Sequence, residues 1–370
     1  MTAEAVRGRV RWVDVLKGVL ILLVIFGHAV QGLAADAMLA AHPQVQGIRL
    51  VKDVIYGFHM PAFFVVSGFF AGGLWRKDLA RELKKKLRRL VKPYFIWGFL
   101  TACGMQVMSS FTNKGEGLMD FLRSPVVPFS QFWYLYVLFF MFLLHCGLSA
   151  VLRRYADRAL LCLSIVLYVA EPLVPDVWML QDFCSHAVYY ALGMFVFSPL
   201  NVFASGAGGA SSAGRVTSVG SASSAGGATS VGSASSAGKA SSTGGPSSLT
   251  SYKSEMAILL GMQGGASLLY GRCCSFLGAA MGFGGAYAAS VLMSRTNGAV
   301  TTALERFGAE SLALYVTHLL AVQGLRIVLV RLLHVSNLWL VALTATVLGS
   351  SLCWAFIQIT KRIGLYRFLF

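Results

Sequence analysis

Long apolar runs, separated by short polar loops, constrain the fold of this chain more than any other feature. A helix that crosses a bilayer needs about 20 mostly apolar residues. We predict ten such spans, at about residues 13–33, 54–74, 94–112, 131–152, 159–171, 184–203, 255–271, 275–293, 308–330 and 338–360. Because a helix satisfies its own backbone hydrogen bonds in lipid, the predicted fold class is all-α, a polytopic membrane helix bundle.

The scarcity of charge excludes a soluble protein. Hydrophobic residues make up 56% of the 370-residue chain and charged residues 12%, with a mean hydropathy of +0.67. Soluble domains carry about 25% charged residues, so this chain lacks the charge to cover a surface that faces water. The seven cysteines lie mostly inside apolar runs and show no CxxC spacing, so we predict neither a disulfide framework nor a metal site.

The basic residues predict an orientation in the membrane. Residues 76–92 hold nine basic and two acidic side chains, a net charge of +7. The other basic groups flank the first, fourth and tenth spans, at Arg7, Arg9, Arg11, Arg153, Arg154, Arg158, Lys361, Arg362 and Arg367. With ten spans all of these segments fall on one side, and the positive-inside rule makes that side the cytoplasm. The net charge of +16 therefore indicates an N-in, C-in membrane protein rather than a nucleic-acid partner. Residues 76–92 are also a candidate surface for attracting a phosphorylated donor.

One segment differs from the rest in composition. Residues 204–252 are mostly Gly, Ala, Ser, Thr and Val, and the nonapeptide SVGSASSAG occurs at 218–226 and again at 230–238. Such a sequence buries too little apolar surface to offset its chain entropy. We therefore predict a cytoplasmic linker at 204–252 between two parts of a transmembrane core, 1–203 and 253–370. A docking segment is the alternative.

The first span carries three ionisable residues, which are costly in lipid and usually mark a site. At 100° per residue, Lys17 and His28 lie on one helix face, about 16 Å apart along the axis, and Asp14 lies on the same stripe. We predict Asp14 and Lys17 near the cytoplasmic mouth of a cavity and His28 in its outer half. In the alternative, Asp14 and Lys17 only pair at the interface, and His28 makes only an interhelical hydrogen bond.

The second span runs in the opposite direction, which predicts that His59 and His28 lie at similar depth. Met60-Pro61 removes a backbone hydrogen bond there. Ser67 lacks the first glycine of a nucleophile elbow, and packing beside Gly68 is its favoured role.

Three further candidates lie in later spans. His318 falls near mid-membrane in the ninth span. Trp133 and Tyr134 form either an outer aromatic belt or a contact to a sugar.

These segments resemble a known family. The sequence contains, in order, DVLKGVLILLVIFGH, FHMPAFFVVSGFF, KKLRRLVKPYF, FWYLYVLF and ESLALYVTHLL. The set resembles the acyltransferase-3 family of integral membrane acyltransferases, nearest its fucose 4-O-acetylase-like branch. The resemblance implies transfer of an acyl group, usually acetyl from acetyl-CoA, to a hydroxyl of an extracytoplasmic or lipid-linked carbohydrate. The family's motif is an arginine and a histidine eleven residues apart; His28 matches the histidine, and Lys17 stands where many members have arginine.

The residues and the resemblance together predict a mechanism. A sugar hydroxyl needs a base whose pKa lies near neutrality, and histidine is the usual choice. We expect His28 as the base and His59 as a second acid/base, with Asp14, Lys17, Ser67, His318, Trp133 and Tyr134 as donor-binding or orienting residues. The expected partners are an acyl-CoA, a carbohydrate or glycolipid acceptor and lipid of the bacterial cytoplasmic (inner) membrane, with no nucleic acid and no bound cofactor. The alternative is a transporter or flippase for a glycolipid or small polar substrate.

Overall fold

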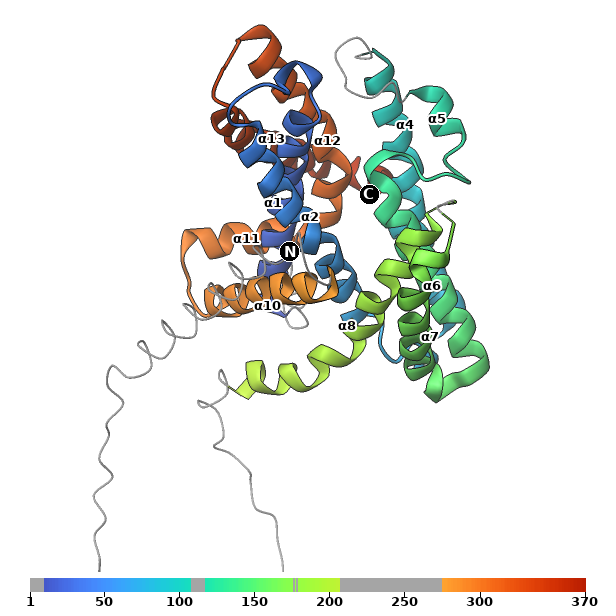
Figure 1. Ribbon diagram of the computed structural model, residues 1–370. Coiled ribbons are helices and arrows are strands. Elements are labelled where there is room, and N and C mark those ends of the chain that lie inside the picture. Colours follow the sequence, from blue (N-terminus) through green and yellow to red (C-terminus); the bar gives the residue numbers. More distant parts are fainter. Residues whose placement is uncertain (1–9, 108–116, 176, 178, 207–274) are drawn as a thin grey trace, which may run out of the picture.

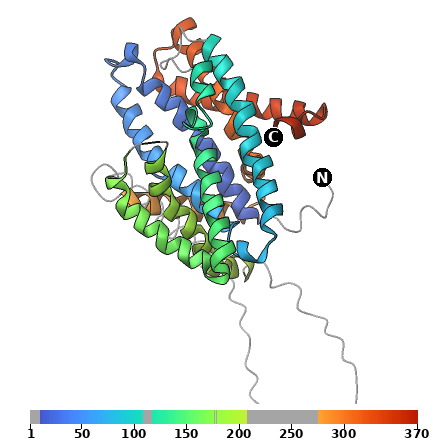
Figure 2. The ribbon, with the colours of Figure 1, turned by 90° about the vertical axis from the view of Figure 1, so that its right-hand side faces the viewer.

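The computed structural model describes residues 10–107, 117–175, 177, 179–206 and 275–370. All regular secondary structure in these ranges is helical, which confirms the all-α prediction. Figures 1 and 2 show the helices side by side in a bundle, with α10 and α11 running across the other helices near one end.

The longer helices begin and end as follows. They are α1 (Arg11–Ala34), α2 (Val45–Phe69), α3 (Leu79–Lys86), α4 (Lys92–Val107), α6 (Trp133–Leu152), α7 (Ala156–Ala170), α8 (Leu180–Gly206), α10 (Ser275–Ser294), α11 (Ala299–Ala309), α12 (Ser311–Ile327) and α13 (Leu338–Arg362). Short elements connect them: α5 (Leu118–Leu122), α14 (Tyr366–Leu369), the 3-10 turns η2 (Ala37–Leu39), η3 (Leu74–Arg76), η6 (Ser130–Phe132), η7 (Arg153–Tyr155) and η8 (Glu171–Leu173), and the π-helical turns η4 (Leu87–Val91) and η9 (Val328–Leu332).

Six helical segments of the described chain are long and apolar enough to cross a membrane. They are Arg11–Ala34, Val45–Arg76, Ser130–Ala170, Ser275–Ser294, Ser311–Leu332 and Leu338–Arg362. Ser130–Ala170 contains two helices, α6 and α7, because the chain breaks at Arg153, whose φ is +49°. The chain is thus a multi-pass membrane protein, while ten spans and their orientation stay predictions. The predicted seventh span, 255–271, and residues 207–252 of the predicted linker lie outside the described residues.

Two helix boundaries differ from the sequence prediction. Helix α2 begins at Val45 rather than near residue 54, since its first turns pack: Ile48 is fully buried in a cluster with Leu338 and Val341. The predicted ninth span begins at Ser311 because the chain bends at Glu310, which has φ −105° and ψ 17°. Pro61 lies inside α2, and the helix continues through it.

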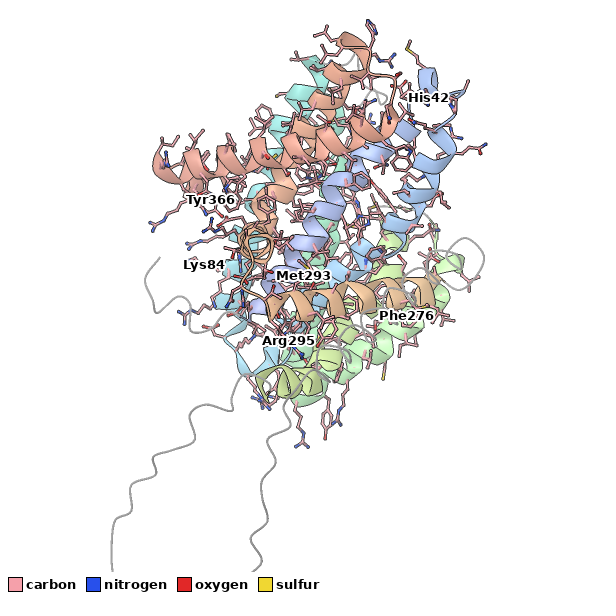
Figure 3. All side chains as sticks on the ribbon, turned by 90° about the vertical axis from the view of Figure 1, so that its left-hand side faces the viewer. His42, Lys84, Phe276, Met293, Arg295 and Tyr366 are labelled. Atoms are coloured by element: carbon pink, nitrogen blue, oxygen red, sulfur yellow. The ribbon has the colours of Figure 1, made fainter. Side chains whose placement is uncertain are left out.

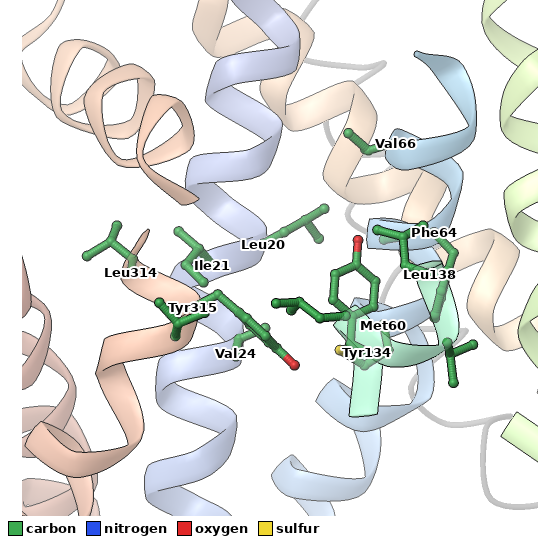
Figure 4. Close-up of a cluster of buried hydrophobic side chains, with 14 of the residues drawn as sticks. Leu20, Ile21, Val24, Met60, Phe64, Val66, Tyr134, Leu138, Leu314 and Tyr315 are labelled. Atoms are coloured by element: carbon green, nitrogen blue, oxygen red, sulfur yellow. The ribbon is translucent and has the colours of Figure 1, made fainter. Parts of the chain in front are cut away.

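Helix α1 is the centre of the bundle. It packs against α2, α10, α11, α12 and α13, and its apolar residues Leu16, Leu20 and Ile21 are fully buried. Figure 4 shows Leu20, Ile21 and Val24 of α1 among side chains of α2, α6 and α12. The polar residues of α1 therefore lie on a helix that other helices of the bundle surround.

Helices α2 and α8 approach so closely that their backbones touch through two glycines. A Cβ atom placed on Gly68 would lie 1.9 Å from the carbonyl oxygen of Tyr190, and one on Gly193 would lie 2.0 Å from that of Val65. Only glycine fits at such contacts, which recur between membrane helices. This agrees with the packing role expected around Ser67-Gly68.

Residues 76–92, or the turn just before them, contact two of the other segments that carry basic residues. Lys92 Nζ donates to the carbonyl oxygen of Arg367 (2.7 Å), and the backbone N–H of Gly73, next to η3, donates to Asp157 Oδ2 (2.9 Å). Figure 3 places Arg295 at the opposite end of the molecule from His42.

Candidate functional site

Two adjoining cavities lie between α1, α2, α12 and the start of α6. The larger has a volume of about 400 Å³ and the smaller about 230 Å³. Both are lined by His28, Tyr56, Gln131, Trp133 and Met179. We call the larger the outer cavity, because Gly32, Ala35 and Arg326 from the ends of α1 and α12 line it, and the smaller the inner cavity, because Val24, His59 and Tyr315 line it. His28 thus stands where the two cavities meet.

His28 has polar neighbours on α1 and α2. The hydroxyl of Tyr56 donates to Gln31 Oε1, and its oxygen lies 3.4 Å from His28 Nδ1. A neutral imidazole that donates Nδ1–H to this oxygen carries its lone pair on Nε2, the form that a general base requires.

His59 is held in a similar way. Its Nδ1 donates to the carbonyl oxygen of Ile55, one turn earlier on α2 (2.6 Å). The ring of Tyr56 lies between the two histidines, with its centroid 6.1 Å from that of His28 and 4.9 Å from that of His59. His28 and His59 therefore meet in one site through Tyr56, and both line the inner cavity. Their equal depth in the membrane stays a prediction.

His318 lies behind His28 rather than in a cavity wall. The two ring centroids are 5.0 Å apart, and His318 is fully buried. Its Nδ1 donates to the carbonyl oxygen of Tyr315 (2.7 Å), and its Nε2 has no protein hydrogen-bond partner among the described residues. His318 therefore contacts the site through the His28 ring.

The neighbouring aromatic residues of α6 have different places. Trp133 lines both cavities, whereas the hydroxyl of Tyr134 meets the hydroxyl of Ser67 in the core (2.9 Å). One role was predicted for Trp133 and Tyr134 together, but the side chains of consecutive helical residues point in directions about 100° apart. Of the two, only Trp133 can contact a ligand in these cavities.

Asp14 and Lys17 lie one turn apart at the other end of α1. Lys17 Nζ is 4.0 Å from Asp14 Oδ1 and 4.6 Å from the centre of the Phe70 ring. Between Lys17 and His28, α1 presents the packed side chains of Leu20, Ile21 and Val24 (Figure 4). Neither Asp14 nor Lys17 is among the residues that line the outer and inner cavities.

A buried carboxylate at the outer end of the site pairs with two arginines. Asp36 Oδ2 lies 3.2 Å from Arg326 Nη1 and 2.9 Å from Arg331 Nη2, and Asp36 and Arg326 are each 3% exposed. Arg326 Nε also donates to Gln323 Oε1 (2.8 Å), while Gln323 Nε2 donates to the carbonyl oxygen of His28 (3.3 Å). This network joins the ends of α1 and α12 beside the outer cavity.

Several residues of the site were not predicted from the sequence. They are Tyr56, Gln31, Gln131, Gln323 and Arg326. Tyr56 and Gln31 each lie three residues from a predicted histidine, one helical turn away, so helix periodicity alone was a usable signal. Arg326 is an ionisable residue inside a predicted span, which is a second usable signal.

The fold and site define an integral membrane protein with histidines grouped around buried cavities, and the comparisons with known proteins give its class. The Acyltransferase domain family, acyltransferase 3, matches residues 10–358. The chain therefore belongs to this family. This confirms the family resemblance seen in the sequence.

Two curated relatives are similar to parts of the chain. Nodulation protein NolL of Sinorhizobium fredii (strain NBRC 101917 / NGR234) is 27% identical over 164 residues, 43% of this chain and 42% of the relative. Nodulation protein NolL of Mesorhizobium japonicum (strain LMG 29417 / CECT 9101 / MAFF 303099) is 29% identical over 136 residues, 35% of this chain and 34% of the relative. The matches span less than half the length of each relative. No solved structure matches the chain.

Proposed function

We propose that this protein transfers an acetyl or short acyl group from acyl-CoA to a hydroxyl of a cell-surface or lipid-linked carbohydrate. The observation that carries the proposal is the position of His28 where the two cavities meet, with a second histidine in the inner one. Two adjoining cavities with shared lining residues suit a reaction that joins two substrates. The fucose 4-O-acetylase-like resemblance of the motifs supports a carbohydrate acceptor.

His28 is the proposed base because it alone of the two cavity histidines lines both compartments. An acceptor in the outer cavity presents its hydroxyl to Nε2, while the acyl group lies in the inner cavity. Tyr56 and Gln31 keep the Nδ1 proton in place. Trp133 offers an aromatic face to the apolar side of a sugar ring. His59, whose Nδ1 is fixed on a backbone carbonyl, is the second acid/base.

The transfer balances without another reactant. As the acceptor oxygen attacks the thioester carbonyl carbon, its proton moves to Nε2 of His28. The tetrahedral intermediate then collapses, the C–S bond breaks, and its electron pair leaves on sulfur. The imidazolium returns the proton to the thiolate, which gives the ester and free CoA. Each of these proton transfers needs a group that titrates near neutrality, and imidazole is such a group.

The donor is proposed to approach from the Lys17 end of α1. An ammonium group there attracts the phosphates of CoA as a point charge, without the bidentate geometry of arginine. The predicted N-in, C-in orientation puts this end in the cytoplasm, where CoA is made, and the outer cavity toward the opposite side of a bacterial inner membrane. The predicted ten spans and the contact of Lys92 with Arg367 support this orientation.

The test is a transfer assay on the purified protein in lipid nanodiscs. The donor is [1-14C]acetyl-CoA, and the acceptors are free and lipid-linked glycosides, fucosides included, with fully O-methylated glycosides as the matched control. We expect alkali-labile label on a glycoside with free hydroxyls and none on the control. Label on no glycoside would overturn the carbohydrate acceptor. Movement of a glycolipid across vesicles without label transfer would favour the flippase alternative.

A further inference from the structure

The wall shared by the two cavities holds a buried amide with no partner. Gln131 is 5% exposed. Neither its Nε2 nor its Oε1 has a hydrogen-bond partner in the part of the chain that the structure describes. Buried polar groups in proteins are nearly always hydrogen-bonded, and those that are not call for an explanation. Gln131 lines both cavities together with His28.

The backbone around Gln131 holds this amide in place. Gln131 belongs to η6, the single 3-10 turn Ser130–Phe132, which leads directly into α6. Tyr315 from α12 donates its hydroxyl to the carbonyl oxygen of Gln131, and Ser130 has a left-handed φ of +48°. The hydrogen bond from Tyr315 and the turn at Ser130 therefore fix the main chain at Gln131, while its side-chain amide has no hydrogen-bond partner among the described residues.

We propose that Gln131 Nε2 donates a hydrogen bond to the carbonyl oxygen of the acyl thioester, and that it strengthens this bond as negative charge develops there. This inference rests on the proposed function. The reaction described above creates an oxyanion beside His28, and a preorganised donor at that position stabilises the transition state. Because the amide is already desolvated and its backbone is held in place, little free energy is needed to reorganise it when the acyl group binds.

A structural role and a role in the reaction predict different effects when the amide of Gln131 is replaced. If Gln131 held the fold together, removing its amide would lower stability. Because the amide has no partner, replacing it by an apolar group of similar size removes an unsatisfied group and is neutral or stabilising. We therefore expect Gln131→Leu to keep or raise Tm. Its kcat for acetyl transfer should fall about 10²–10³-fold, the usual effect of losing one oxyanion donor.

Two further variants separate charge from geometry. Gln131→Glu keeps the size but places a carboxylate against the developing oxyanion, so kcat should fall at least as far as in Gln131→Leu. Gln131→Asn keeps the amide but withdraws it by one methylene, so it should be intermediate. Gln358→Leu is the matched control, since this partly exposed glutamine of α13 lines neither cavity. It should leave kcat unchanged.

The kinetic readout distinguishes the two substrates. Loss of kcat with an unchanged acceptor KM supports a contact to the acyl carbonyl. A raised acceptor KM with unchanged kcat would place the amide on the acceptor instead and overturn the proposal. If the wild type transfers acetyl and Gln131→Leu has a normal kcat, the proposal is also overturned.

A spectroscopic readout needs no acceptor. Isotope-edited infrared spectra of bound [1-13C]acetyl-CoA should show the thioester carbonyl stretch at lower frequency in the wild type than in Gln131→Leu, with Gln358→Leu like the wild type. Equal frequencies in all three proteins would overturn the inference while leaving the transfer activity standing. If the wild type binds no acetyl-CoA, the donor assignment of the proposed function fails, and this inference fails with it.

Discussion

At the scale of single residues, the site is a set of imidazole and amide groups whose hydrogen bonds fix their chemistry. Each of His59 and His318 donates Nδ1–H to a backbone carbonyl, which leaves Nε2 as the other ring nitrogen. Nδ1 of His28 faces the hydroxyl of Tyr56. What distinguishes them is place: only His28 borders both cavities.

His28→Ala tests the base directly. We expect acetyl transfer to fall about 10²–10⁴-fold, the usual contribution of a positioned proton acceptor, while affinity for acetyl-CoA is kept, because the proposed anchor lies about 16 Å away along α1. Lys17→Ala should show the opposite pattern, with weaker acetyl-CoA binding. The measurement is transfer rate and donor affinity on folded variants, with Tm as the control. Near-normal turnover of His28→Ala would remove the proposed base.

Helix periodicity in the sequence predicted part of this site, and the remaining residues depend on tertiary contacts that periodicity does not indicate. His28 and His59 were predicted to lie in one site because consecutive spans run antiparallel, although α2 begins at Val45 and His59 is therefore farther from the outer end of its helix than His28 is. Gln131 was not found, since it precedes α6 and meets Tyr315, 184 residues later, through a tertiary hydrogen bond. No local pattern encodes such a contact. Trp133 and Tyr134 differ in position because one side chain lines the cavities and the other contacts Ser67 in the core, and these tertiary contacts cannot be derived from the local sequence.

At the scale of helices, close packing and one ion pair position the site. The α2–α8 contact depends on Gly68, and the α1–α12 contact at the outer end depends on the pair Asp36–Arg326. The start of α2 and the break before α12 escaped prediction for the same reason. Hydropathy finds the apolar part of a helix, whereas its ends depend on tertiary contacts such as that of Ile48 with Leu338.

Gly68→Ala should separate α2 from α8. The new Cβ would lie 1.9 Å from a backbone oxygen, which no side-chain rotation relieves, so we expect a loss of about 1–3 kcal/mol, as for overpacked cores. Gly147→Ala is the matched control, because its Cβ meets nothing within 4 Å and alanine favours the helix by up to about 1 kcal/mol. The measurement is thermal unfolding in detergent. Equal Tm values for the two variants would contradict the close packing.

Asp36→Asn should destabilise the outer end more strongly. It leaves the guanidinium of Arg326 buried without the carboxylate that it shares with Arg331, and breaking a buried pair from one side costs about 3–5 kcal/mol. Arg326→Met in the Asp36→Asn background removes the more buried of the two unpaired arginines, so the double variant should recover part of the loss. The measurement is a double-mutant cycle of unfolding free energies. Additive losses would mean that the two side chains do not interact.

At the scale of the whole molecule, the proposed reaction needs two sides of a membrane. The donor is proposed to enter near Lys17 and the acceptor near Arg326, at opposite ends of the path along α1. Composition and hydropathy sufficed to predict a multi-pass helical protein. Lipid as the surrounding solvent requires long apolar segments whose backbone hydrogen bonds are satisfied within a helix. The number of spans depends on segments such as 255–271, which lie outside the described residues.

The orientation itself is the last prediction. Nine basic residues in 76–92 are hard to translocate, so this segment should face the cytoplasm, and the loop that joins α1 to α2 should face the other side. Ala80 and Ala41 are exposed residues of these two segments. In a cysteine-free variant, Ala80→Cys should react with a membrane-impermeant thiol reagent only after the cells are opened, and Ala41→Cys should react in intact cells. Labelling of Ala80→Cys in intact cells would reverse the orientation and place the donor end of α1 outside, where no acyl-CoA reaches it.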